Sequence, residues 1–162
     1  MKDVIVDTNV LVVANRQNAQ VAPSCVDACV AFVESALEEH VALIDRAGDI
    51  LTEYYRNLKD GWPYELGKRY CMALIQQQHV STRVRIVDLP KSADGEYVDF
   101  PNTPGLATFD RSDRKFAALA KATGTPVTNA TDSDWANFLP ALTANGINVE
   151  FLCGGDPLRW FK

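Results

Sequence analysis

Five acidic residues from distant parts of the sequence follow predicted strands, precede predicted helices or, in one case, lie inside a helix. They are Asp7, Glu53, Asp110, Asp113 and Asp132. Carboxylates held close together repel one another unless they are protonated or share a cation. Because every candidate ligand atom is an oxygen, the ion expected between them is hard, Mg²⁺ or Mn²⁺ rather than Zn²⁺ or Cu²⁺. The predicted metal ligands are Asp7, Glu53, Asp113 and Asp132.

Helix capping by itself accounts for several of these residues. Asp110, Asp113 and Asp132 precede helical segments, where an aspartate side chain can accept hydrogen bonds from free backbone N–H groups. Asp7 alone could close a turn on its own backbone, and Glu53 alone could be a solvated helix residue. Capping does not explain why Asp7 ends a strand or why Glu53 lies inside its helix. Their joint placement therefore favours a metal site.

The elements that would position these acids alternate between strand and helix. Short runs rich in β-branched residues predict strands at 4–6, 41–44, 84–89, 125–128 and 147–152. Helical periodicity predicts helices at 23–37, 50–58, 64–79, 116–123 and 135–142. This order predicts an α/β fold, a three-layer α/β/α sandwich around a mainly parallel, Rossmann-like sheet. Ligands of such sheets bind beyond the carboxyl ends of the strands, where the acids are placed.

Length and composition fit one domain, residues 1–162. Of the 162 residues 47% are hydrophobic and 23% are charged, which is enough for one core and too little for two. The 16 Lys and Arg against 21 Asp and Glu give a formal net charge of −5, which argues against a protein that coats nucleic acid with a basic surface. Because no apolar stretch is long enough for a membrane span, we expect a cytoplasmic protein without a membrane partner.

The four cysteines are expected to be free thiols. Cys25, Cys29, Cys71 and Cys153 lack the spacings that are typical of zinc sites. With so few nitrogen ligands in the chain, they are predicted to be small buried hydrophobic residues in a reducing compartment.

One long segment, residues 90–109, shows no convincing periodicity and contains several prolines and glycines. Loops of this length are unusual in a compact domain and are often functional. The segment is predicted to be either a flap or a short extra hairpin around Tyr97, at the rim of the fold and outside the core.

Four stretches, in order along the chain, resemble the motifs of PIN-domain nucleases. They are Val4–Leu11, a hydrophobic strand ending in Asp-Thr-Asn; Ile50–Tyr54, with its central Glu; Asp110–Ala120, with acids before an alanine-rich helix; and Val127–Trp135, similar to Val-Thr-x-Asp followed by a second acid. The likeness covers residues 3 to about 152. It implies a PIN-like fold and a metal-dependent endonuclease or phosphodiesterase that acts mostly on RNA.

Two features depart from the family pattern. Three residues rather than one separate Thr128 from Asp132, so Asp132 is the preferred ligand and Asp134 is the alternative. The third motif offers both Asp110 and Asp113, and Asp113 fits the family position better. The residues expected to surround and orient the ligands are Thr8, Asn9, Thr128 and Asp134.

The function favoured by these residues is hydrolysis of phosphodiester bonds in RNA or another single-stranded nucleic acid. Asp7, Asp113 and Asp132 would hold one or two ions, with Glu53 and Asp110 contributing directly or through water. The ions would lower the pKa of an attacking water and stabilise charge on the phosphate. Many small bacterial members of the family are toxins, so an antitoxin is a candidate partner, although this chain is longer than a minimal toxin. A second copy of the chain is the other candidate protein partner.

Two other classes of function stay open at this point. One is a PIN-like module that binds RNA or a protein without cutting; loss of the site acids would favour it, and this sequence keeps them. The other is phosphoryl transfer through an aspartyl phosphate on Asp7, as in haloacid-dehalogenase-like phosphatases. Those enzymes need an aspartate two residues further on, where this chain has Asn9.

Overall fold

The computed structural model describes residues 1–61 and 63–162 and has a five-stranded sheet at its centre. The strands are β1 (Lys2–Val6), β2 (His40–Asp45), β3 (Val84–Val87), β4 (Val127–Asn129) and β5 (Val149–Phe151). They lie in the order β3-β2-β1-β4-β5, and every pairing is parallel. Each strand overlaps one of the predicted apolar runs, and the predicted α/β class with a parallel, Rossmann-like sheet is confirmed.

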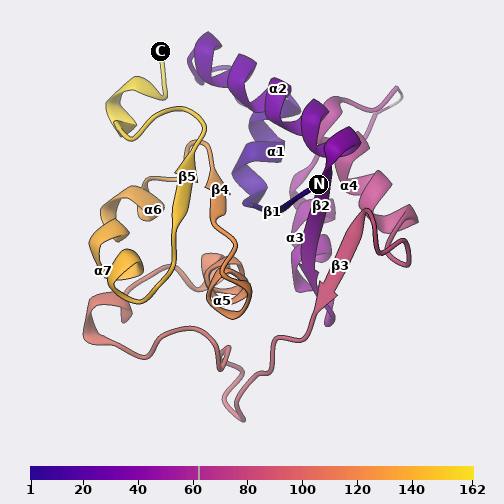
Figure 1. Cartoon of the computed structure of the whole chain (residues 1–162). Helices are drawn as coiled ribbons and strands as arrows, with labels where there is room; N and C mark the ends of the chain where they lie inside the picture. Colours follow the sequence, from indigo (N-terminus) through magenta and orange to yellow (C-terminus); the bar gives the residue numbers. More distant parts are fainter. Residues whose placement is uncertain (62) are drawn as a thin grey trace.

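Helices fill the connections between the strands. They are α1 (Thr8–Ala14), α2 (Pro23–Glu39), α3 (Asp49–Asn57), α4 (Leu66–Gln76), α5 (Arg114–Thr123), α6 (Ser133–Asn137) and α7 (Leu139–Ala144), with short 3₁₀ turns η1 (Pro104–Leu106), η2 (Arg111–Asp113) and η3 (Pro157–Arg159). The helices α1 to α4 pack on one another, whereas α5 packs on β1, β2 and β4 (Figure 1). Because crossovers between parallel strands are right-handed, these two sets of connections cover opposite faces of the sheet. Among the helices of the described residues, none combines the length and apolar character that crossing a bilayer requires.

The direction in which strands are added to the sheet reverses at β1. The chain runs outward from β1 to β2 and β3, and then returns to the other side of β1 to add β4 and β5. Sheets of this kind bind ligands in the crevice at the reversal point, beyond the carboxyl ends of the two strands concerned. Here those strands are β1, which Asp7 follows directly, and β4, which ends three residues before Asp132.

Residues 133–144 form two short helices, so the prediction of one continuous helix is wrong. Pro140 lacks an N–H donor, and in a continuous helix its ring would clash with the carbonyl of residue 136. The chain therefore ends α6 and starts α7 with Pro140 in the first turn. Trp135 and Leu142 are nevertheless fully buried, as their apolar spacing predicted.

Residues 90–109 contain a short hairpin, one of the two predicted forms, but Leu106 and Phe109 in their second half belong to the core. Lys91 and Tyr97 form an isolated antiparallel bridge around an exposed turn. Leu106 and Phe109 point inward and are almost fully buried, so the expectation of a segment entirely outside the core is wrong. A single 3₁₀ turn such as η1 is too short to show a periodic apolar pattern.

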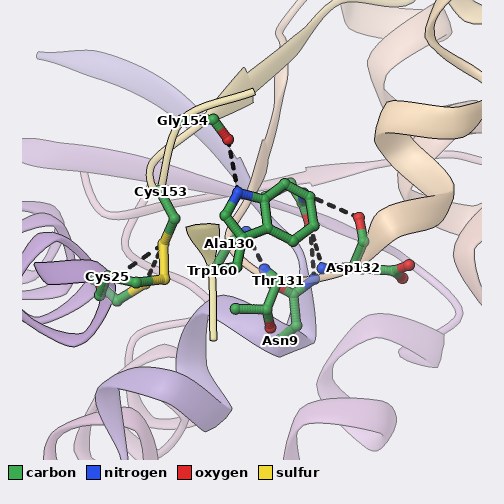
Figure 2. The surroundings of a disulfide bond; sticks show 10 residues. Asn9, Cys25, Ala130, Thr131, Asp132, Cys153, Gly154 and Trp160 are labelled. Carbon is green, nitrogen blue, oxygen red and sulfur yellow. Dashed lines mark hydrogen bonds between the residues drawn. A yellow bond between two sulfur atoms is a disulfide. The ribbon is translucent and has the colours of Figure 1, made fainter. Parts of the chain in front are cut away.

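The prediction of four free thiols is wrong for two of the cysteines. Cys25 on α2 and Cys153 just after β5 form a disulfide between positions 128 residues apart, with their Cα atoms separated by 4.8 Å (Figure 2). Cys29 and Cys71 are free and buried, as predicted. The pairing of β5 with β4 brings position 153 close to position 25, so their spacing in the sequence gave no sign of the bond. Because disulfides are typical of oxidising compartments, the argument for a reducing one is lost.

Candidate metal centre

Aspartates from three parts of the chain meet beyond the carboxyl ends of β1 and β4. Asp7, Asp113 and Asp132 each offer one carboxylate oxygen, and these atoms all lie within 4.8 Å of one another. Asp110 and Asp134 form a second group of the same kind with Asp113. Asp7 and Asp113 are buried, with exposed fractions of 3% and 5%. We call these five residues the carboxylate cluster.

Asp113 precedes α5 but does not cap it. Its side chain accepts no hydrogen bond from the first turn of that helix. Its Oδ2 atom is buried and has no hydrogen-bond partner among the described residues. Leaving a buried acceptor unpaired costs about 1–3 kcal/mol, and more for a charged group. Capping therefore does not account for Asp113. A cation from solution would satisfy its free oxygen, as would a proton shared with Asp132 in the metal-free protein.

Asp132 and Asp110 do cap helical segments. Asp132 Oδ1 accepts a hydrogen bond from the Asp134 N–H at 2.9 Å at the start of α6. Asp110 Oδ1 accepts one from the Ser112 N–H at 3.1 Å at the start of η2. Each cap uses one oxygen of the carboxylate, so capping and metal binding are compatible at both positions.

Asp7 joins β1 to α1 and is held from several sides. Its backbone N–H donates to the Thr128 carbonyl at 3.0 Å, which extends the pairing of β1 with β4. Its Oδ1 accepts a hydrogen bond from the Asn9 N–H at 3.3 Å. This is the bond to a nearby backbone group by which Asp7 was expected to close a turn. Its Oδ2 accepts a hydrogen bond from the indole N–H of the fully buried Trp135. The sequence placed Trp135 on an apolar helix face but gave no signal of this contact.

Burial and mutual repulsion raise the pKa values of the clustered carboxyl groups. For Asp7, burial is the largest cause and the charge of Asp132 the next, and together they raise its pKa to about 7 although the Trp135 hydrogen bond lowers it. For Asp113, burial again comes first, followed by the charges of Asp7 and Asp132, and its pKa lies far above the ordinary range. The metal-free cluster therefore retains protons near neutral pH, which is typical of functional sites.

This retention of protons predicts an unusual pH dependence of stability in the metal-free protein. Between about pH 4, where an unfolded aspartate ionises, and about pH 7, the folded chain keeps protons that the unfolded chain has released. The cluster's contribution to the free energy of unfolding should therefore fall as the pH rises, by up to about 1.4 kcal/mol per pH unit for each retained proton.

Urea unfolding in EDTA across this pH range measures the slope. Other titrating groups contribute to it, so the comparison is between the wild type and Asp113→Asn, in which one of the retained protons is gone. The variant should gain stability relative to the wild type as the pH rises. Parallel curves for the two proteins would contradict the raised pKa of Asp113.

Glu53 lies beside the carboxylate cluster and is held by two other side chains. Lys115 Nζ donates to Glu53 Oε1 at 2.6 Å, and the Thr8 hydroxyl donates to Oε2. Among the described residues, Glu53 does not belong to either group of converging carboxylates. Its negative charge is close enough to help raise the pKa of Asp7. The structure thus places Glu53 next to the predicted ligands, with both of its oxygens occupied by Lys115 and Thr8.

Asn9 organises the segment that carries Asp132. Its Oδ1 accepts from the N–H groups of Ala130 and Thr131 at 2.8 and 3.0 Å, and its Nδ2 donates to Asn129 Oδ1 at 2.9 Å. Asn129 in turn accepts from the Asp132 N–H at 3.2 Å and donates to the Asp132 carbonyl at 3.1 Å. Figure 2 shows this segment folded around Asn9. The segment with the two extra residues of the fourth motif therefore forms a turn that the side-chain amides of Asn9 and Asn129 hold. Asn129 was not among the site residues predicted from the sequence.

A polar cavity of about 410 Å³ lies on the Glu53 side of the cluster. Its lining residues are Asp49, Thr52, Glu53, Arg56, Asn57, Tyr97, Ser112 and Lys115. Asp49 is paired with Lys91 at 2.7 Å, and Glu53 with Lys115, whereas Arg56 has no ion pair among the described residues. Ser112 directly precedes Asp113 in the chain, but the five residues of the carboxylate cluster are not among those that line the cavity. The cavity thus offers an anion both space and one unpaired positive charge.

The structure therefore brings Asp7, Asp113 and Asp132 together and places Glu53 at their side. All ligand atoms on offer are carboxylate oxygens, which suit a hard divalent cation such as Mg²⁺ or Mn²⁺, and the free Asp113 Oδ2 is an atom that such an ion would satisfy. Comparisons of the chain with protein-family models, curated proteins and solved structures gave no match. Function must therefore be inferred from the arrangement of these side chains.

Proposed function

We propose that the chain is a PIN-like, metal-dependent nuclease that hydrolyses phosphodiester bonds in RNA. The observation that carries this proposal is the carboxylate cluster at the reversal point of the sheet, where Asp113 is shared by both groups of acids and keeps one buried oxygen without a partner. The four ordered motifs that resemble PIN-domain nucleases supply these same acids. The motif order and the convergence of these acids therefore support the same chemistry.

The residues proposed to hold Mg²⁺ or Mn²⁺ are Asp7, Asp113 and Asp132, and Asp110 and Asp134 offer oxygens for a second ion. When bound, such an ion lowers the pKa of a water nucleophile and stabilises negative charge on the phosphate. Trp135 fixes the orientation of the Asp7 carboxylate, because its indole donates to Oδ2. Asn9 holds the turn that presents Asp132.

The side chains of the cavity fit a phosphate chain. Arg56 can pair with a phosphate of the substrate without breaking an ion pair in the protein, as far as the described residues show. Lys115 and Thr8 hold the Glu53 carboxylate in the wall of the cavity, beside the cluster. A strand of nucleic acid bound in the cavity would lie next to Glu53, which in turn lies beside the carboxylate cluster.

Phosphoryl transfer through an aspartyl phosphate is less well supported. It requires an aspartate two residues after Asp7, and Asn9 stands there with its amide engaged by Ala130 and Thr131. A side-chain amide has no acidic proton, so Asn9 cannot protonate a leaving group as an aspartate would. The non-catalytic module remains the alternative that an experiment must separate from the nuclease.

The resemblance alone supports the proposed protein partners, an antitoxin and a second copy of the chain, in the setting of a cytoplasmic toxin and its antitoxin. An inhibitory antitoxin would have to cover the cavity or reach the carboxylate cluster. The disulfide between Cys25 and Cys153 is more common outside the cytosol, so the nuclease activity has more support than the cytoplasmic setting.

Cleavage of a single-stranded RNA oligomer in Mn²⁺, Mg²⁺ or EDTA tests the proposal. We expect cleavage in either ion and none in EDTA, and we expect Asp7→Asn to lose it, because that variant removes an ionised ligand. Asp156→Asn is the matched control, since Asp156 is an exposed cap of η3 outside the cluster. DNA of the same sequence and calorimetry of Mn²⁺ binding complete the experiment. Ion binding without cleavage of either nucleic acid would favour the non-catalytic module, and cleavage that persists in EDTA would contradict a metal mechanism.

A further inference from the structure

Three cysteine side chains meet where α2 faces the turn after β5. Cys25 and Cys153 form the disulfide, and Cys29 Sγ lies 4.0 Å from Cys153 Sγ. The three sulfur atoms all lie within 4.8 Å of one another. We call these residues the cysteine cluster. The proposed nuclease chemistry makes no use of it.

The geometry of α2 presents two of these sulfurs together. Cys25 and Cys29 are four residues apart, so they lie on the same face of the helix, one turn apart. Both are buried, whereas Cys153 is partly exposed. Cys153 approaches both helix positions at once, because its sulfur is bonded to one cysteine and in contact with the other.

The turn that carries Cys153 is held by contacts that do not depend on the disulfide. The fully buried Trp160 donates its indole N–H to the Gly154 carbonyl at 2.7 Å (Figure 2). The Trp160 carbonyl accepts from the Ala22 N–H at 2.8 Å, directly before α2 begins. These contacts tie both sides of the cysteine cluster together, so reduction should leave its three thiols close to one another.

We propose that the reduced protein binds one thiophilic d¹⁰ cation, Cu⁺ or Zn²⁺, through the cysteine cluster. Thiolates prefer such ions, whereas the carboxylate cluster suits Mg²⁺ or Mn²⁺. With a Zn–S bond of about 2.3 Å, two thiolates on one tetrahedral ion stand roughly 3.8 Å apart. The 4.0 Å between the sulfurs of Cys29 and Cys153 is already close to that spacing. The sulfur of Cys25 reaches it when the disulfide bond is broken.

The disulfide must be reduced before the ion can bind. Reduction adds two electrons and two protons to the disulfide, which gives the free thiols of Cys25 and Cys153. A phosphine reductant supplies the electrons and takes an oxygen atom from water to become its oxide. The ion then displaces a proton from each thiol that coordinates it.

The test uses the full chain, reduced with a phosphine, freed of reductant and kept without oxygen. Zn²⁺ and Cu⁺ are titrated separately, each in competition with a coloured chelator, which shows which of the two ions the site takes. The reduced wild type should bind one equivalent of ion more than the oxidised protein. An ion that binds to the carboxylate cluster is present in both measurements and therefore cancels in the difference. Cys71→Ala should behave like the wild type, because Cys71 lies outside the cysteine cluster.

Variants of the cysteine cluster decide whether it is the site. Cys29→Ala removes one proposed ligand but still allows the disulfide to form. Loss of an outer partner of a metal site costs roughly 10- to 100-fold in affinity, so loss of this direct ligand should weaken binding by more than that. Cys153→Ala is the second variant, since this partly exposed residue is truncated with less effect on packing. Circular dichroism records the fold at each step. The proposal is overturned if the reduced wild type, folded or not, binds no more of either ion than the oxidised protein, or if both variants keep wild-type affinity.

Discussion

Asp113→Asn should abolish RNA cleavage and at the same time make the metal-free protein more stable. In the wild type the buried Asp113 carboxyl must retain a proton or face the charges of Asp7 and Asp132, which is why its pKa is raised. An amide of the same shape carries no charge and can donate to the neighbouring carboxylates. One unit of pKa shift is worth about 1.4 kcal/mol, so at about pH 8 the free energy of unfolding in EDTA should rise by at least about 1 kcal/mol.

The same change removes an ionised ligand from the proposed ion. Mutation of an outer partner of a metal site already costs roughly 10- to 100-fold in metal affinity or activity, so loss of a direct ligand should reduce cleavage by more than about 100-fold. Stability and activity would then move in opposite directions. Urea unfolding in EDTA and RNA cleavage in Mn²⁺, run on one preparation, measure both.

Asp156→Asn again serves as the control, because that side chain caps η3 through the Leu158 N–H and an asparagine caps about as well. It should leave both stability and cleavage unchanged. Near-normal cleavage by Asp113→Asn would remove Asp113 from the metal site. If Asp113→Asn is instead less stable than the wild type in EDTA, the Asp113 carboxylate has a structural role other than capping α5.

Reduction of the Cys25–Cys153 disulfide should be the largest single change in stability. The bond joins positions 128 residues apart, and in the chain-entropy model a loop of that length stabilises the folded state by about 5 kcal/mol. Measured effects of native disulfides are typically about 2–5 kcal/mol, which is a large part of the roughly 5–15 kcal/mol that holds a domain folded. Urea unfolding with and without a phosphine gives the difference directly.

The double variant Cys25→Ala/Cys153→Ala provides the control for the reductant. It should be destabilised about as much as the reduced wild type and should lose nothing more when phosphine is added. Further loss would mean that the reductant acts elsewhere. If the reduced wild type binds Zn²⁺ or Cu⁺ as proposed, addition of that ion should restore part of the lost stability, because a ligand that binds only the folded state favours it.

Local chemistry determined most of the architecture from the sequence. The apolar run 4–6 is too short for a helix and too apolar for an exposed loop, so it had to be a buried strand with Asp7 at its end, and the same reasoning located the other strands. The alternation of strands and helices then required parallel pairing. Each helical crossover returns the chain to the end of the sheet where the previous strand began, so the next strand runs in the same direction. The caps formed by Asp110 and Asp132 were also predictable, since each bond joins an aspartate to an N–H two residues away.

Tertiary structure decided which of the predicted site residues act together. Capping and metal binding predict the same residue type at Asp113, and only the three-dimensional arrangement shows that its side chain makes no cap and keeps a buried oxygen free. Glu53 was expected among the ligands, yet its oxygens are taken by Lys115, 62 residues away, and by Thr8. The disulfide between Cys25 and Cys153 likewise joins residues that are far apart in the sequence. These contacts depend on the order of the strands. That order pairs β1 with β4 across more than a hundred residues, and a pattern that extends over a few residues cannot encode it.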